Sequence, residues 1–252
     1  MIPKIIHYCW FGGKPLPELA RKCIASWRKY LPEYEIKEWN ESSFDVNIIS
    51  YTAEAYQAKK YAFVSDYARF WILYRYGGLY FDTDVEIIRP MQEIIDRGPF
   101  MGCECETQKG AMPDEMDIAP GLGLGVYPGL GLYKEILDLY ATLHFFNADG
   151  TRNEKTVVQY TTEVFVRHGL KNINQPQLIA GVYIYPKDYF NPMNRQTREI
   201  HPTEITYSIH HYAGSWTSPF SRFKRKLKYM LGPDIMRILI NIKMRFRNHK
   251  SV

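Results

Sequence analysis

The sequence predicts a mixed α/β protein, a sheet with helices on its flanks, and three observations predict it. The chain of 252 residues is 46% hydrophobic, which is enough apolar material for one large core. Residues 4–39 run as apolar strand, helix and strand, an order that favours parallel pairing through a right-handed crossover. Residues 64–86 then repeat a helix-to-strand order around a double glycine. We expect one domain over residues 1–218 and a tail over residues 219–252.

The first elements place two aromatic residues at the edge of the predicted sheet. We expect a strand over residues 4–10, a helix over residues 17–30 and a strand over residues 34–39. Ligands of such sheets lie beyond the carboxyl ends of the strands, which places Trp10 and Phe11 at a pocket for a nucleobase. The alternative for Trp10 is a place in the core, where buried aromatic residues are common.

The stretch from Val64 to Glu86 predicts a helix, a glycine stop, a strand and an acidic tip. Ser65 has the side chain of a helix N-cap, and the double glycine at 77 and 78 supplies the left-handed conformation that ends a helix. Asp66 and Arg69 are three residues apart and share one helix face.

The acidic tip carries two carboxylates at alternate positions. Asp82 and Asp84 follow the apolar strand at residues 79–81, and both can point at one hard cation. A divalent ion held there would bind a polyphosphate and stabilise the negative charge of a departing diphosphate. An Asp-x-Asp triplet alone also marks turns and solvated strand ends.

The rest of the body is a series of predicted helices and strands. The glycine-rich stretch at 119–125 has neither a Walker-type lysine nor a Rossmann spacing, so we favour a buried strand with close backbone approach over a phosphate cradle. The other predicted elements are a helix at 50–62, a strand at 85–89, helices at 132–146 and 155–169, and a strand at 179–185.

A second part of the site is expected near residue 210. A strand through His210 and His211 could bring one neutral imidazole to the ion, and alternation sends the other ring to the opposite face. Ser215 and Trp216 would then belong to a loop that closes over the diphosphate and excludes water. The alternative for Trp216 is an aromatic anchor that fastens the tail to the core.

Three blocks of sequence together resemble glycosyltransferase family 32. The blocks are residues 65–84 with Ser65-Asp66-x-x-Arg69, the double glycine and Asp82-x-Asp84, residues 2–12, and residues 210–216. That family includes bacterial capsular polysaccharide transferases and fungal initiating mannosyltransferases, and it is related to the glucosyltransferase domains of large clostridial toxins. The resemblance covers about residues 1–218, and the middle section matches loosely.

The resemblance implies a fold, a reaction and a set of cofactors. The fold would be the GT-A type, with a Rossmann-like mixed sheet and flanking helices. The enzyme would be a retaining hexosyltransferase that uses Mn²⁺ or Mg²⁺ and a nucleotide-diphosphate sugar, with UDP-sugars as the first expectation and a guanosine diphosphate donor left open.

The resemblance also assigns roles to residues. Asp84 would ligate the metal directly, Asp82 would contact the ribose and, through water, the metal, and His211 would be the third metal contact while His210 is structural. Trp10 would stack on the base. Asp66 and Arg69 would bind hydroxyl groups of the donor sugar, and Tyr80 would line the same pocket.

The tail differs in composition from the body. It carries ten Lys or Arg and one acidic residue, whereas the whole chain has a net charge of +5. Its apolar residues predict two basic amphipathic helices broken at Gly232 and Pro233, which suit an anionic membrane surface. The alternatives are docking of these helices on the enzyme, or nucleic acid, for which the tail shows no recognised binding module.

The predicted setting is the cytoplasm, at the inner face of the cell membrane. Cysteines at 9, 23, 103 and 105 show no zinc-type pairing and no disulfide-dense pattern, and no apolar run is long enough for a signal peptide or a membrane span. The expected acceptor is a glycan or an undecaprenyl-diphosphate-linked sugar of capsular polysaccharide biosynthesis. Two rival functions are a non-catalytic nucleotide-sugar-binding module and a metal-dependent hydrolase or nucleotidyltransferase.

Overall fold

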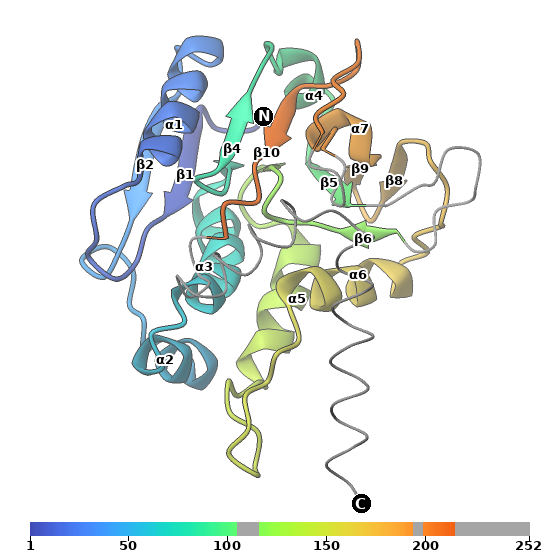
Figure 1. The fold of residues 1–252 in the computed structure, drawn as a ribbon. Coiled ribbons are helices and arrows are strands. Elements are labelled where there is room, and N and C mark those ends of the chain that lie inside the picture. Colours follow the sequence, from blue (N-terminus) through green and yellow to red (C-terminus); the bar gives the residue numbers. More distant parts are fainter. Residues whose placement is uncertain (105–115, 194–198, 215–252) are drawn as a thin grey trace, which may run out of the picture. The chain divides into compact units, whose positions relative to one another are not determined.

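The computed structural model describes residues 1–104, 116–193 and 199–214 (Figure 1). Residues Met1–Met193 and Ile200–Tyr212 form one compact unit that holds every described helix and strand. The helices are α1 Glu18–Tyr30, α2 Ser50–Gln57, α3 Tyr61–Tyr76, α4 Gln92–Asp96, α5 Gly131–Ala141, α6 Val157–Arg167 and α7 Lys187–Phe190. The strands are β1 Ile5–Cys9, β2 Glu35–Trp39, β3 Gly78–Tyr80, β4 Val85–Ile87, β5 Phe100–Glu104, β6 Asp117–Ile118, β7 Leu124–Val126, β8 Gln177–Ile179, β9 Val182–Tyr185 and β10 Ser208–His210.

The described strands form one large mixed sheet and one small ribbon. The large sheet has the order β2-β1-β3-β7-β5-β9-β8, with β6 beside β5. Strand β1 pairs in parallel with both β2 and β3, as the strand-helix-strand order predicted, while β7 pairs antiparallel with β3 and β5. The ribbon is the antiparallel pair β4 and β10.

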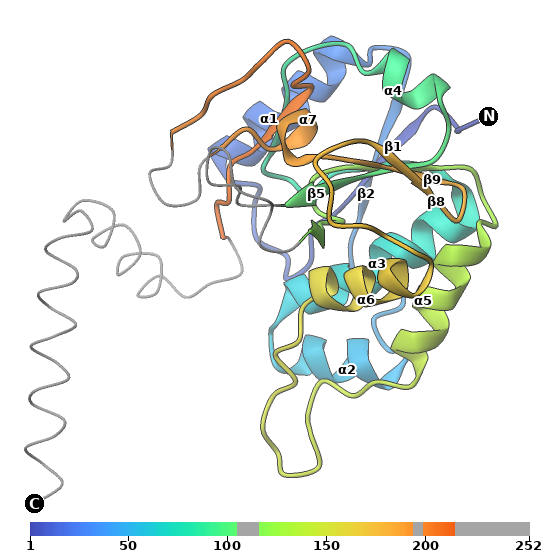
Figure 2. The same ribbon diagram turned by 90° about the vertical axis from the view of Figure 1, so that its right-hand side faces the viewer.

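Helices cover both faces of the large sheet, so the prediction of a mixed sheet with flanking helices is confirmed. In Figure 2, α1, α4 and α7 lie on one side of the strands and α3, α5 and α6 on the other. Two buried hydrophobic clusters match these layers, one with side chains of α3, α5 and α6 and one with side chains of α1, α4 and α7. Since apolar side chains leave the sheet on both faces, each face needs such a cover.

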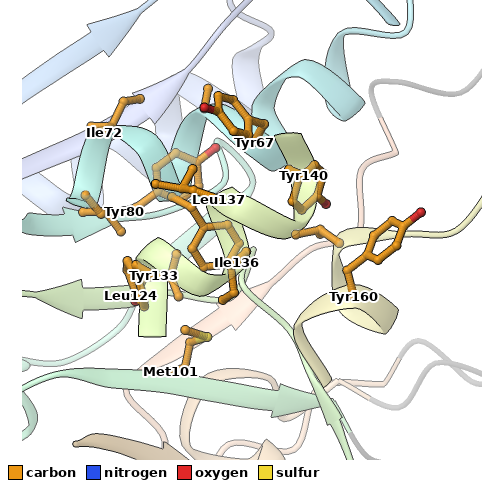
Figure 3. Close-up of a cluster of buried hydrophobic side chains, with 14 of the residues drawn as sticks. Tyr67, Ile72, Tyr80, Met101, Leu124, Tyr133, Ile136, Leu137, Tyr140 and Tyr160 are labelled. Carbon is orange, nitrogen blue, oxygen red and sulfur yellow. The ribbon is translucent and has the colours of Figure 1, made fainter. Parts of the chain in front are cut away.

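Many of the 20 tyrosines belong to the core rather than to a surface. Figure 3 shows Tyr67, Tyr80, Tyr133, Tyr140 and Tyr160 among the aliphatic side chains of the α3–α5–α6 layer. All five are buried, and aromatic pairs such as Tyr67 with Tyr140 lie within stacking range. For these residues the high aromatic content reflects packing of the core.

Several helix and strand boundaries differ from the sequence prediction. Helix α3 begins at Tyr61, so Ser65 is not its N-cap; the Ser65 hydroxyl donates instead to the Tyr61 carbonyl oxygen, 3.2 Å away. The helix predicted over residues 50–62 is interrupted at Lys59, whose φ of 56° is left-handed. The strand predicted over residues 179–185 is likewise divided by a turn at Ala180 and Gly181, which have φ values of 46° and 82°.

The tail lies outside this description, and so do the lid residues Ser215 and Trp216. The predicted basic amphipathic helices of residues 219–252 therefore stay predictions. Among the described residues, no helix has the length and hydropathy that a bilayer span requires.

The His7 side chain, on β1, links this strand to β2 and to the end of α3. Its ring is 1% exposed, accepts a hydrogen bond from Trp39 Nε1 at Nδ1 and donates from Nε2 to the Gly77 carbonyl oxygen, both at 3.0 Å. This pattern requires the neutral ring with the proton on Nε2. Burial lowers the pKa of His7 to about 4, and Gly77, which closes α3 with a φ of 63°, opposes that shift only in part.

His7 is expected to make the protein acid-sensitive. As the pH falls from 6.5 towards about 4, unfolded His7 takes up a proton that the buried ring does not accept, so the free energy of unfolding decreases. His7→Gln removes this contribution. Between pH 7 and pH 4 the free energy of unfolding of the wild type, measured by urea unfolding, should therefore fall by about 3 kcal/mol more than that of His7→Gln. A gap that is the same at both pH values would contradict this role.

Candidate active site

The acidic tip is a turn between β3 and β4. The Asp82 backbone N–H donates to the Gly121 carbonyl oxygen at 3.2 Å, and the Val85 N–H donates back to the Asp82 carbonyl oxygen at 3.0 Å. Phe81 is fully buried before the turn, so the chain leaves the core at Asp82. The backbone thus presents both aspartates at the carboxyl end of a central strand, where α/β sheets bind ligands.

A histidine from the far end of the chain joins the two aspartates. Asp82, Asp84 and His210 each offer one ligand atom, and these atoms lie within 4.8 Å of one another. His210 Nε2 is 3.1 Å from Asp84 Oδ1, and all three side chains are half-buried. Two carboxylate oxygens and one imidazole nitrogen fit Mn²⁺ or Mg²⁺, since both ions take oxygen ligands and Mn²⁺ also accepts imidazole.

The structure brings His210, rather than His211, to the aspartates. The prediction named His211 as the third metal contact and His210 as structural. The β4–β10 register places His210 opposite Val85, next to Asp84. The His211 ring lies instead with Nε2 2.8 Å from Glu86 Oε2, although its backbone N–H donates to the Asp84 carbonyl oxygen. Alternation does separate the two imidazoles, as expected, but it assigns them the other way round.

Arg69 links the helix to the acidic tip. Its guanidinium is 3.1 Å from Asp66 and 3.4 Å from Asp82, and its centre lies 4.9 Å from the centroid of the Tyr80 ring. The Tyr80 hydroxyl donates to Asp82 at 3.3 Å, and Arg69 Nε donates to the Ser65 carbonyl oxygen. The three-residue spacing of Asp66 and Arg69 therefore makes the shared helix face that the sequence predicted.

Burial governs the charges in this cluster. Arg69 is 3% exposed, and although burial disfavours its charged form, Asp82, Tyr80 and Asp66 together raise its pKa. Burial also raises the pKa of Asp66 to about 7, and Asp82 adds to that rise while Arg69 opposes it. Near neutral pH the Asp66 carboxyl thus holds a proton part of the time and can act as donor as well as acceptor.

The two aromatic residues of the predicted base pocket have different surroundings. Phe11 is buried and packs edge-on against Phe44, with ring centroids 5.9 Å apart. Trp10 is half-buried, and its indole N–H donates to the Lys14 carbonyl oxygen at 2.5 Å. Trp10 therefore keeps exposed surface at the end of β1, whereas Phe11 belongs to the core.

Gly121 is a site residue that the sequence argument did not single out, although it expected close backbone approach in this stretch. A Cβ atom added at Gly121 would lie 2.2 Å from Asp82 Oδ2 and 3.6 Å from an Arg69 Nη atom. Contacts below 3.0 Å do not occur, so any larger residue must displace the Asp82 carboxylate. Glu86 was also missed, although it continues the alternation of Asp82 and Asp84 by two residues.

Comparison with known proteins shows what the region around this site is similar to. Residues 17–101 match the family described as the glycosyltransferase sugar-binding region containing a DXD motif. The matched stretch contains Asp66, Arg69, Tyr80, Asp82 and Asp84. The resemblance to glycosyltransferase family 32 is thereby confirmed.

Particular relatives match part of the chain. Inositol phosphoceramide mannosyltransferase 1 of Schizosaccharomyces pombe is 30% identical over 111 residues, which are 40% of this chain and 33% of that protein. Inositol phosphoceramide mannosyltransferase 3 of the same organism is 30% identical over 105 residues, which are 37% and 27% of the two chains. The chain thus matches a third or less of the length of these curated relatives. A solved glycosyltransferase involved in the glycosylation of the major capsid of PBCV-1 aligns over 90% of this chain and 100% of that chain, with a TM-score of 0.49 and 16% identity.

Gly121→Ala is expected to disturb the site while leaving the fold intact. The added methyl group meets the far end of the Asp82 side chain, which can rotate away, so unfolding should be affected by less than about 1 kcal/mol. The displaced carboxylate should weaken Mn²⁺ binding about tenfold, measured by titration. Gly131→Ala is the matched control because nothing lies within 4 Å of its added Cβ. Equal affinities of the two variants would contradict this role of Gly121.

Proposed function

We propose that this protein is a metal-dependent, retaining glycosyltransferase of the GT-A type that transfers a sugar from a nucleotide-diphosphate donor to a glycan or lipid-linked acceptor. The observation that carries the proposal is the cluster of Asp82, Asp84 and His210 at the end of a central strand, inside a chain whose donor-binding region matches a glycosyltransferase family. A hydrolase would need two carboxyls flanking the scissile bond and no nucleotide.

Asp82, Asp84 and His210 would hold Mn²⁺ or Mg²⁺. The bound ion would neutralise the negative charge that develops on the departing diphosphate. In this proposal His210 takes the role that the family resemblance implied for His211, because its imidazole shares the cluster with both carboxylates. Besides its place in this cluster, Asp82 forms an ion pair with Arg69.

Arg69 and Asp66 would orient the donor sugar. Their buried ion pair lies against Asp82, so hydroxyl groups bound to them sit next to the diphosphate position. Arg69 supplies several N–H donors in a fixed plane, and Asp66 accepts or donates according to its protonation. The resemblance implies retention of the anomeric configuration. No obvious nucleophile stands out in the sequence, so retention would follow from attack of the acceptor on the same face as the leaving diphosphate.

Trp10 would stack on the nucleobase of the donor. Two classes of donor sugar are candidates. The resemblance favours a UDP-sugar, whereas the curated relatives are named mannosyltransferases, which makes a mannosyl donor the second candidate. Ser215 and Trp216 would close the site and exclude water, because water competes with the acceptor for the sugar.

Asp84→Asn tests the proposal directly. Loss of one carboxylate ligand should lower turnover at least about 100-fold, because metal stabilisation of the leaving group amounts to several kcal/mol. Release of free nucleotide from UDP- and GDP-sugars is measured with and without Mn²⁺, and Asp138→Asn, at an exposed carboxylate paired with Lys134, is the control. Full activity of Asp84→Asn, or sugar release that needs no nucleotide, would refute the transferase.

The basic tail is proposed to hold the enzyme on the inner face of the cell membrane, near an undecaprenyl-diphosphate-linked acceptor. The full chain should bind vesicles that contain anionic phospholipid and not neutral vesicles, and high salt should release it. Replacing Lys224, Arg225 and Lys226 by Gln should weaken binding about 100-fold, at about 1 kcal/mol for each charge. Equal binding of the triple variant in a co-sedimentation assay would show that the tail has another role.

A further inference from the structure

We propose that Glu86 is a positioning residue of the metal site. It holds the His211 imidazole, and this contact keeps the β4–β10 ribbon in the arrangement that presents His210 to Asp82 and Asp84. The inference rests on the proposed function, because it concerns how the proposed metal ligands are held. It adds a residue that is not one of the three proposed metal ligands.

The ribbon needs support from outside because it is short. Strands β4 and β10 have three residues each, and they pair with each other rather than with the large sheet. An isolated two-stranded pair of this kind is at best marginally stable in water. Yet two of the three proposed ligands belong to it or adjoin it, since Asp84 directly precedes β4 and His210 is the last residue of β10.

Helix α1 holds one strand of the ribbon, β4. The buried Trp27 indole N–H donates to the Val85 carbonyl oxygen at 2.8 Å, and the Ile87 backbone N–H donates to the Ser26 hydroxyl at 2.9 Å. Both bonds satisfy backbone groups of β4, which fixes that strand on α1. They do not reach β10, which is tied at its first residue to α7, where the Ser208 hydroxyl donates to the Phe190 carbonyl oxygen at 3.3 Å. Glu86 adds a contact at the other end of β10, next to His210.

Glu86 makes such a contact at the end of β10. Its carboxylate lies 2.8 Å from His211 Nε2 and 3.2 Å from Lys22 Nζ, so it connects the residue after His210 to α1. The Glu86 and His211 side chains are 20% and 18% exposed, and a charged hydrogen bond is stronger at such a site than at an open surface.

This contact also separates two neighbouring imidazoles. Either histidine could compete for the ion, since both side chains stand next to a carboxylate of the same alternating series. With His211 held on Glu86, His210 is the imidazole that remains beside the aspartates. Glu86 therefore determines that His210 is the imidazole ligand, and it also holds the end of β10.

The test uses Mn²⁺ alone, so it needs no donor or acceptor. Mn²⁺ affinity is measured by electron paramagnetic resonance for wild type, Glu86→Gln, Glu86→Asp and His211→Gln, with thermal unfolding as the check on folding. Loss of a residue that orients metal ligands should weaken binding about tenfold in each variant. Glu86→Asp is decisive, because it keeps the charge but is too short to preserve the contact. Unchanged affinity in that variant together with loss in Glu86→Gln would reduce Glu86 to a simple electrostatic effect and overturn the proposal.

A double variant separates positioning from electrostatics further. If Glu86 acts through His211, then Glu86→Gln should change Mn²⁺ affinity less than about twofold in the His211→Gln background. An equal tenfold effect in both backgrounds would overturn the proposal. Glu163→Gln is the matched control. The exposed Glu163 carboxylate, on α6, pairs with Lys155, and the substitution changes the charge by the same amount.

Pulsed electron paramagnetic resonance identifies the ligating nitrogen. The wild-type Mn²⁺ complex should show coupling to an imidazole nitrogen that is lost in His210→Gln and kept in His211→Gln. The reverse pattern would overturn the proposal and restore His211 as the ligand. If the proposed function itself is wrong, the wild type would bind no Mn²⁺, whereas failure of the Glu86 proposal leaves wild-type binding intact.

Discussion

The ion pairs of the buried Arg69 guanidinium with Asp66 and Asp82 hold the site together. A charge this far from water is tolerated only with close partners, and Arg69 has two carboxylates and the face of Tyr80 within reach. Because these partners come from α3, β3 and the acidic tip, the charge fixes the helix against the strand. The same constraint explains why Gly121 has no side chain, since its backbone occupies the space beside the Asp82 carboxylate.

The β4–β10 ribbon brings the other two members of the proposed metal cluster next to Asp82. The large sheet positions Asp82, whereas the ribbon carries Asp84 and His210 and depends on α1 for its support. The proposed metal would therefore join two separately supported parts of the same body. A metal held in this way would stabilise the folded state by mass action.

The tyrosines illustrate how composition alone can mislead. Their number is compatible with stacking on bases and sugar rings, but Tyr67, Tyr133 and Tyr140 lie in the core between α3, α5 and the sheet. Tyr80 is a core residue that also contacts the acidic tip, because its ring is buried against Arg69 while its hydroxyl donates to Asp82. In this protein the aromatic content builds the layer that supports the site more than the site itself.

The sequence by itself determined the features that depend on short spacings. The periodicity of residues 4–39 gave β1, α1 and β2, the three-residue interval put Asp66 beside Arg69, and the alternation after the double glycine put Asp82 and Asp84 on one turn. Helix starts were less certain, as at Ser65, because apolar residues before the apparent cap extend the buried face of α3. Local patterns of this kind are set by the geometry of a single element.

Only the tertiary structure decided which distant residues meet. The choice of His210 over His211 depends on the register of β10 against β4, and a shift of one residue would exchange them. The closeness of Gly121 to Asp82 and the bond from Glu86 to His211 also join segments that lie far apart in the chain. Such contacts follow from the packing of several elements at once, so no spacing within one segment could have revealed them.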